Sequence, residues 1–148
     1  MKRTLGLILA LALAGAFAIA SQARTTQSSS RHGALHATKE CSQYNGQAGS
    51  FCTITGSNLP EIGAGSKVFY LEPAGQSGID SDLVLYTGPG NVALGHVTLS
   101  FASRSGSVTF HGGTGDFRTF RARVLVTFDP ATNLWHWDGA YRFLADED

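Results

Sequence analysis

The sequence predicts an all-β fold, a single antiparallel closed β-barrel of about eight strands. Short runs rich in β-branched and aromatic residues recur along the chain, and their polarity alternates with a period of two. Glycine or proline turns separate these runs, and no stretch after the first apolar run shows helical periodicity. Several runs are apolar on both faces, which favours a closed barrel over a two-layer sandwich.

The N-terminal residues are typical of an export signal. Lys2 and Arg3 precede an apolar run over residues 5–20, and small residues follow it. The run is short for a hydrocarbon layer of about 30 Å and is diluted by alanine and glycine, so a cleaved signal peptide over residues 1–23 is favoured over a membrane anchor. We therefore expect the mature protein to be secreted or periplasmic.

The next segment, residues 24–40, is rich in Ser, Thr, Gln, Arg and His. Such a composition is too polar to contribute to a core and predicts a disordered leader. The remaining residues, 41–148, are enough for one domain, which we expect to be the β-barrel.

The charge balance limits the partners. After residues 1–23 are removed, nine Lys/Arg face eleven Asp/Glu. A slightly acidic chain is not expected to bind nucleic acid, which requires a basic surface. Because the sequence contains no second long apolar run, we expect no membrane partner for the mature protein. Zinc spacing, an EF-hand loop and a dinucleotide fingerprint are missing from the sequence, which therefore predicts no metal and no cofactor.

The two cysteines, Cys41 and Cys52, bracket a short polar segment. In an exported protein an even cysteine count predicts a disulfide, worth roughly 3 kcal/mol for a loop of this size. The alternative, a reactive thiol paired with a histidine, requires protection from oxidation.

The first three predicted strands are bounded by clear breakers. Residues 51–55 alternate and end at a Gly-Ser-Asn turn, and residues 67–72 are apolar on both faces and end at Pro73. Residues 82–87 are closed by a turn that contains two glycines around Pro89.

The later strands alternate more regularly. Residues 96–101 place apolar side chains on one face, and a tight hairpin at residues 104–106 leads to a strand at 107–110. Residues 121–128 follow a glycine corner, and residues 135–143 follow an Asp-Pro turn and carry the aromatic side chains of one face.

The glycine corner contains Gly112, Gly113 and Gly115. Three glycines so close together disfavour a helix, and they permit positive φ and close backbone approach between strands. We expect these glycines to be structural, with at least one that leaves no room for a side chain or has positive φ.

The corner Gly112–Arg118 resembles the GGTGxF corner of dirigent proteins and is similar to the GGSGxF corner of allene oxide cyclases. The strand order around it also matches, over residues 65–143. The resemblance implies an exported, bacterial-type member with an eight-stranded antiparallel, calycin-like barrel and an apolar cavity. A homo-oligomer is also implied, because the plant families are often trimeric.

Allene oxide cyclases carry a catalytic glutamate on the first strand, whereas residues 41–60 here contain no acidic residue. This departure disfavours allene oxide cyclisation itself. Dirigent proteins carry buried aspartates and arginines that steer phenoxy radicals, and the resemblance suggests Asp80, Asp82, Arg121 and Arg123 for those roles.

The candidate catalytic residues are Asp80, Asp82 and His96. Two carboxylates two residues apart share one face of a strand, where their pKa values can separate as in an acid/base pair. His96 is a candidate general base near neutral pH. The alternative is that all three are solvated surface groups.

Aromatic residues are the candidate ligand-binding groups, either as core or as the lining of a cavity. They are Tyr70, Tyr86, Trp135, Trp137, Tyr141 and Phe143. The sequence favours a barrel that binds a small apolar or phenolic molecule and steers its coupling or cyclisation. An isomerase or cyclase with a buried acid or base, and a non-catalytic structural or interaction module, remain open.

Overall fold

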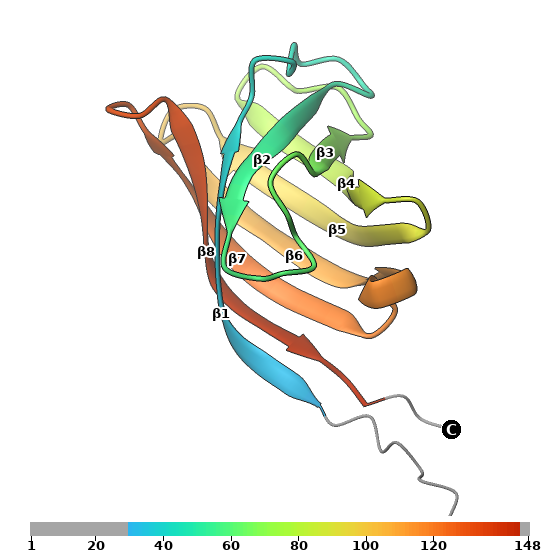
Figure 1. The fold of residues 1–148 in the computed structure, drawn as a ribbon. Helices are drawn as coiled ribbons and strands as arrows, with labels where there is room; N and C mark the ends of the chain where they lie inside the picture. Colours follow the sequence, from blue (N-terminus) through green and yellow to red (C-terminus); the bar gives the residue numbers. More distant parts are fainter. Residues whose placement is uncertain (1–29, 146–148) are drawn as a thin grey trace, which may run out of the picture.

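The structure, a computed structural model, describes residues 30–145 and is an eight-stranded antiparallel closed barrel (Figure 1). The strands follow chain order, and β8 pairs with β1 to close the barrel. This confirms the predicted fold class. The elements are β1 Arg31–Glu40, β2 Phe51–Ser57, β3 Lys67–Tyr70, β4 Gly78–Gly88, β5 Asn91–Ser100, β6 Ser105–Thr114, the 3-10 turn η1 Gly115–Phe117, β7 Phe120–Asp129 and β8 Leu134–Phe143.

The first strand corrects one prediction. Residues 31–40 were expected within a disordered leader, but they form β1, and the barrel therefore begins ten residues before Cys41. β1 pairs with β8 from Arg31 to Lys39. Backbone pairing of this length orders a segment with few large apolar side chains, and its inward positions include the buried Leu35 and Ala37. The predicted signal peptide, residues 1–23, and residues 24–29 lie outside the described residues.

A loop completes the wall where β2 stops. Along β1, the pairing with β2 covers only the last residues of the strand, Ala37–Glu40. Beyond them, the Asn58 side-chain amide donates to the Ala34 carbonyl at 2.9 Å and the His36 N–H donates to Asn58 Oδ1 at 2.8 Å. The loop thereby places Leu59, 2 % exposed, and Ile62 in the core.

The barrel is filled by side chains over most of its length. The core includes Phe110, Phe120 and Trp137, whose rings contact one another at centroid distances of 5.5 and 5.6 Å around Phe110. Phe117 from η1 packs on Phe120 at 5.3 Å. This end of the barrel, where β8 finishes, is therefore closed by aromatic packing.

The glycine corner behaves as predicted, although β6 extends through it to Thr114. A Cβ added at Gly113 would lie 1.8 Å from the Val92 carbonyl oxygen. Gly112 has φ 130° and Gly115 has φ 57°, conformations that side chains disfavour. The glycines therefore let β6 pass close to β5 and turn into η1.

Cys41 and Cys52 form the predicted disulfide between the end of β1 and the start of β2. Free cysteines do not occur among the described residues. Within residues 30–145, no helix has the length and apolar character needed to cross a membrane.

Candidate functional site

One end of the barrel carries the turns that follow β1, β3, β5 and β7, and we call it the disulfide end (Figure 1). A recess of about 620 Å³ lies there, lined by Phe101, Arg104, Phe128, Asn133 and Trp135. The Phe128 and Trp135 rings are 5.0 Å apart, and the Arg104 guanidinium carbon is 5.4 Å from the Phe128 centroid. The recess therefore combines an aromatic wall with one cationic group.

Lys39 projects from β1 into the barrel at the same end. It is 4 % exposed and pairs across the sheet with Trp135, which lines the recess. Its ammonium nitrogen Nζ donates a hydrogen bond to the Tyr70 hydroxyl. The same nitrogen lies 5.1 Å from the Tyr70 ring centre and 5.2 Å from the Trp137 ring centre. Aromatic rings thus take the place that a carboxylate occupies beside most buried lysines.

None of the ion pairs within residues 30–145 involves Lys39. Burial lowers the pKa of Lys39 from 10.5 to about 7, because desolvation disfavours the ammonium form and no carboxylate in the described residues offsets it. Burial raises the pKa of Tyr70, so its hydroxyl stays protonated. The amine can exist in either form near neutral pH, beside a neutral hydroxyl that accepts from the ammonium or donates to the free amine.

Two further polar atoms in this region are buried without a hydrogen-bond partner in the described protein, Trp137 Nε1 and the Tyr44 hydroxyl. The Tyr44 ring packs on Tyr70 with centroids 4.9 Å apart. Buried donors ordinarily find partners, and exceptions often mark functional positions. The disulfide end therefore gathers one amine and two unpaired donors within aromatic surroundings.

The disulfide adjoins this cluster. Cys52 Sγ lies 3.7 Å from the Tyr70 hydroxyl oxygen. Because Cys41 follows Lys39 by two residues, the bridge ties the end of β1 and the start of the next loop to β2. The bridge thus holds the wall from which Lys39 projects.

The predicted ligand-binding residues separate into three places. Three lie at the disulfide end: Tyr70, Trp135 and Trp137. Tyr141 and Phe143 pack against the core near the opposite end, where the Phe143 ring is 5.1 Å from Phe120. Tyr86 is 40 % exposed and alternates with the buried Leu85, so it lies on the outer face. The six aromatic residues do not form one site.

The predicted catalytic residues Asp80, Asp82 and His96 do come together. His96 Nε2 is 2.7 Å from Asp80 Oδ1, and His96 Nδ1 is 2.8 Å from Asp82 Oδ1. The hydrogen bonds that the His96 ring makes to the Asp82 and Asp80 carboxylates raise the pKa of His96. The side chains are exposed on the outer face, 79 % for Asp80, so the cluster is a surface clamp away from the barrel interior.

Two expectations that came from the resemblance are also changed. Arg121 and Arg123 lie on the outer face of β7, alternating with the buried Ala122, and do not enter the barrel. The first strand is β1 and ends in Glu40, whose side chain accepts the Ser42 N–H at 2.8 Å near the surface. The interior position beside it belongs to Lys39.

Sequence reasoning missed Lys39 because it assigned residues 24–40 to a leader. A period-two signal was nevertheless present, since Leu35, Ala37 and Lys39 alternate with polar residues up to Cys41. Lysine is rarely buried, so its presence at the third inward position made the segment look too polar for a strand of the barrel. Among residues 30–145, no group of three or more His, Cys, Asp or Glu side chains is arranged to hold a metal ion.

No family model matches the chain, and no curated protein matches it. Among solved structures, the chain is similar to one described as the structure of a pterocarpan synthase dirigent protein. The two chains are 13 % identical, the match covers 80 % of this chain and 88 % of that chain, and the TM-score is 0.45. At this level of similarity, the side chains of this chain itself carry the evidence on function.

Proposed function

We propose that this protein is an exported β-barrel that binds a small apolar or phenolic molecule at its disulfide end. In this proposal the ring of the ligand lies in the recess beside Phe128 and Trp135, and its hydroxyl points toward Lys39, the cross-strand neighbour of Trp135. The disulfide supports export, because such bonds persist in oxidising compartments.

The observation that carries the proposal is the buried Lys39 amine without a carboxylate partner, next to an aromatic recess. A free amine accepts a hydrogen bond from a phenol, and the ammonium form pairs with a phenolate. Either form gives the ligand a polar anchor within apolar walls, which is the usual composition of a small-molecule site. Held in this way, a reactive phenol presents one face, which is what steering a coupling or cyclisation requires.

The same amine supports a second candidate, an isomerase or cyclase that moves a proton. A general base works best when its pKa lies near the working pH, and that of Lys39 is about 7. The neutral Tyr70 hydroxyl, which is hydrogen-bonded to the amine, would serve as the matching donor. In this version the base is a lysine in place of the carboxylates and histidine expected from the sequence.

Tryptophan fluorescence tests binding, because Trp135 and Trp137 flank the site. We expect para-propylphenol to change the emission saturably. Lys39→Met should weaken its binding about tenfold, the loss of one hydrogen bond to a charged group. The same substitution should leave the affinity for para-propylanisole, which lacks the hydroxyl donor, unchanged. Lys67→Met is the matched control, because Lys67 is exposed on β3.

If neither compound produces a saturable change while the protein is folded, the ligand-binding proposal fails and the barrel is structural. Proton transfer has a separate readout, the exchange of the α-protons of tetralone in heavy water. For an enzyme, the exchange rate should rise with pH around 7, disappear in Lys39→Met and persist in Lys67→Met.

A further inference from the structure

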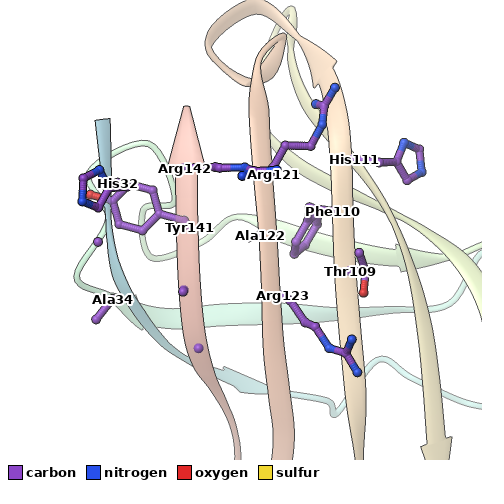
Figure 2. Close-up of a pocket in the computed structure, with 13 residues that line it drawn as sticks. His32, Ala34, Thr109, Phe110, His111, Arg121, Ala122, Arg123, Tyr141 and Arg142 are labelled. Atoms are coloured by element: carbon purple, nitrogen blue, oxygen red, sulfur yellow. The ribbon is translucent and has the colours of Figure 1, made fainter. Parts of the chain in front are cut away.

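A second concavity lies on the outside of the barrel, on the sheet formed by β6, β7, β8 and β1 (Figure 2). Its volume is about 860 Å³. Small residues of β1 and β8, including Ala34, Gly139 and Ala140, line part of it, so the surface is hollowed where larger side chains would fill it. The hollow is separate from the recess at the disulfide end, because the two share no lining residue.

Arginine and histidine side chains cross this hollow in one row. His32 pairs with Arg142, and Arg142 pairs with Arg121 on the next strand. Figure 2 shows His111 of β6 on the far side of Arg121, and Arg123 lower on β7. With strands about 4.8 Å apart, four neighbouring strands carry this row over ~14 Å.

The arginines of the row lack acidic partners within residues 30–145. The ion pairs there use one arginine, Arg31, which binds Glu61. Two acidic side chains on the same outer face pair with histidines, Asp138 with His36 at 2.7 Å and Asp129 with His136 at 3.9 Å. Acids and arginines are thus segregated on one sheet, although the cross-strand positions would allow them to alternate.

Arg121 and Arg142 stand directly opposite each other, an arrangement of like charges that destabilises a sheet. The backbone nevertheless holds Arg121 in place. Its Nη1 donates to the Phe120 carbonyl at 2.8 Å, and a Cβ at Gly112 would lie 3.0 Å from the same nitrogen. The glycine leaves room for the guanidinium, and a bound anion would offset the repulsion.

We propose that this hollow, which we call the cationic groove, binds a linear acidic polysaccharide through its uronate or sulfate groups. Arginine forks suit carboxylates and sulfates, and the row is long enough to meet several successive charged sugars. Ala34 and Ala140, which pair with each other beside this row, leave room for sugar rings next to the charged groups. Because the whole chain has equal numbers of acidic and basic residues, binding to a polyanion depends on this local concentration of charge.

The test measures affinity for two defined oligosaccharides, an oligogalacturonide and a heparin oligosaccharide, by calorimetry at low and moderate salt. We expect saturable binding of at least one, weakened by salt. The double variant Arg121→Gln/Arg142→Gln should lose at least tenfold in affinity. The double variant Lys67→Gln/Arg118→Gln removes the same charge from exposed residues that do not line the groove, and its affinity should stay within about twofold of the wild type. Arg123→Gln gives a second groove variant if the first folds poorly.

Two results would overturn the proposal. The first is no saturable binding of either oligosaccharide, or an equal loss of affinity in both double variants. The second is self-association abolished by Arg121→Gln/Arg142→Gln without oligosaccharide binding, which would assign the groove to a second copy.

Discussion

Lys39 is the residue on which the proposed function depends. An amine inside a protein loses hydration that the single hydrogen bond it donates to Tyr70 replaces only in part. Its contacts with the Tyr70 and Trp137 rings stabilise the cation, but less than a carboxylate would. The lowered pKa follows from that imbalance, and it lets the amine act near neutral pH.

The shift of Lys39 predicts a dependence of stability on pH. Between about pH 7 and 10.5 the unfolded chain binds the lysine proton and the native chain does not, so stability rises with pH. Above pH 10 the raised pKa of Tyr70 acts in the opposite direction, so we compare pH 7 with pH 10. Urea unfolding should show a gain on the order of 3 kcal/mol over this range.

Lys39→Met should remove most of this gain and make the protein more stable at pH 7, because methionine fills the space without a charge. Lys67→Met should keep the wild-type slope. Identical slopes in the wild type and in Lys39→Met would show that the amine is hydrated in the folded protein.

His96 offers a second test at the residue scale. Asp82 and Asp80 raise its pKa, so a proton titration followed by NMR should give a value above the usual 6.5. Asp82→Asn should lower it more than Asp80→Asn, since the Asp82 hydrogen bond is the largest cause. The hydrogen bonds of His96 to the two aspartates stabilise the folded protein fully below the pKa that His96 has in the unfolded chain. This contribution is lost as the pH rises through the pKa of His96 in the folded protein. Because the site is exposed, it amounts to less than about 1 kcal/mol. An unchanged titration in Asp82→Asn would refute the clamp.

At the scale of elements, β1 determines both sites. Its inward positions carry Lys39 to the disulfide end, and its outward positions carry His32 to the cationic groove. The strand is ordered by pairing with β8 along most of its length, although its composition is that of a polar leader. Long-range pairing of this kind overrides local composition.

The glycine corner gives a prediction for β5 and β6. Gly113→Val should lower the free energy of unfolding by more than ~1 kcal/mol, because its Cβ would lie 1.8 Å from the Val92 carbonyl oxygen. Gly63→Val is the control, since nothing lies within 4 Å of a Cβ there. Chemical denaturation measures both, and equal stability of the two variants would show that the strands separate at the corner at little cost.

The disulfide gives another prediction at this scale. Replacing Cys41 and Cys52 by alanine should lower stability by about 3 kcal/mol in the chain-entropy model. It should also raise the pKa of Lys39, because a looser β1 end admits water to the amine. Intact mass after alkylation without reductant checks the bridge in the exported protein, where two added alkyl groups would contradict it.

At the scale of the whole molecule, period-two patterns and turn residues predicted an all-β sandwich or barrel, and the runs that are apolar on both faces favoured the barrel. Strand runs such as 121–128 and the glycines at 112–115 predicted local structure, which their own sequence determines. The shared face of Asp80 and Asp82 was also predictable, whereas their contact with His96 depends on the β4–β5 register.

The sequence did not predict where the barrel is filled and where it is open. That division depends on side chains distant in sequence, such as Leu59 and Phe117, packing into one interior. The family resemblance also suggested that Arg121 and Arg123 lie inside the barrel. Their alternation with the buried Ala122 places both side chains on its outer face. Register and closure, which are properties of the assembled sheet, decided these positions.

The central claim is that a neutral-pH amine, Lys39, lies inside the barrel and anchors a phenolic ligand. NMR of lysine side chains labelled at Cε and Nζ, with Lys39→Met to assign the signal, measures the pKa of Lys39 directly. We predict a value near 7 in the free protein and a clear shift of that signal when para-propylphenol saturates the site. A value near 10.5 with no response to the phenol would contradict the account.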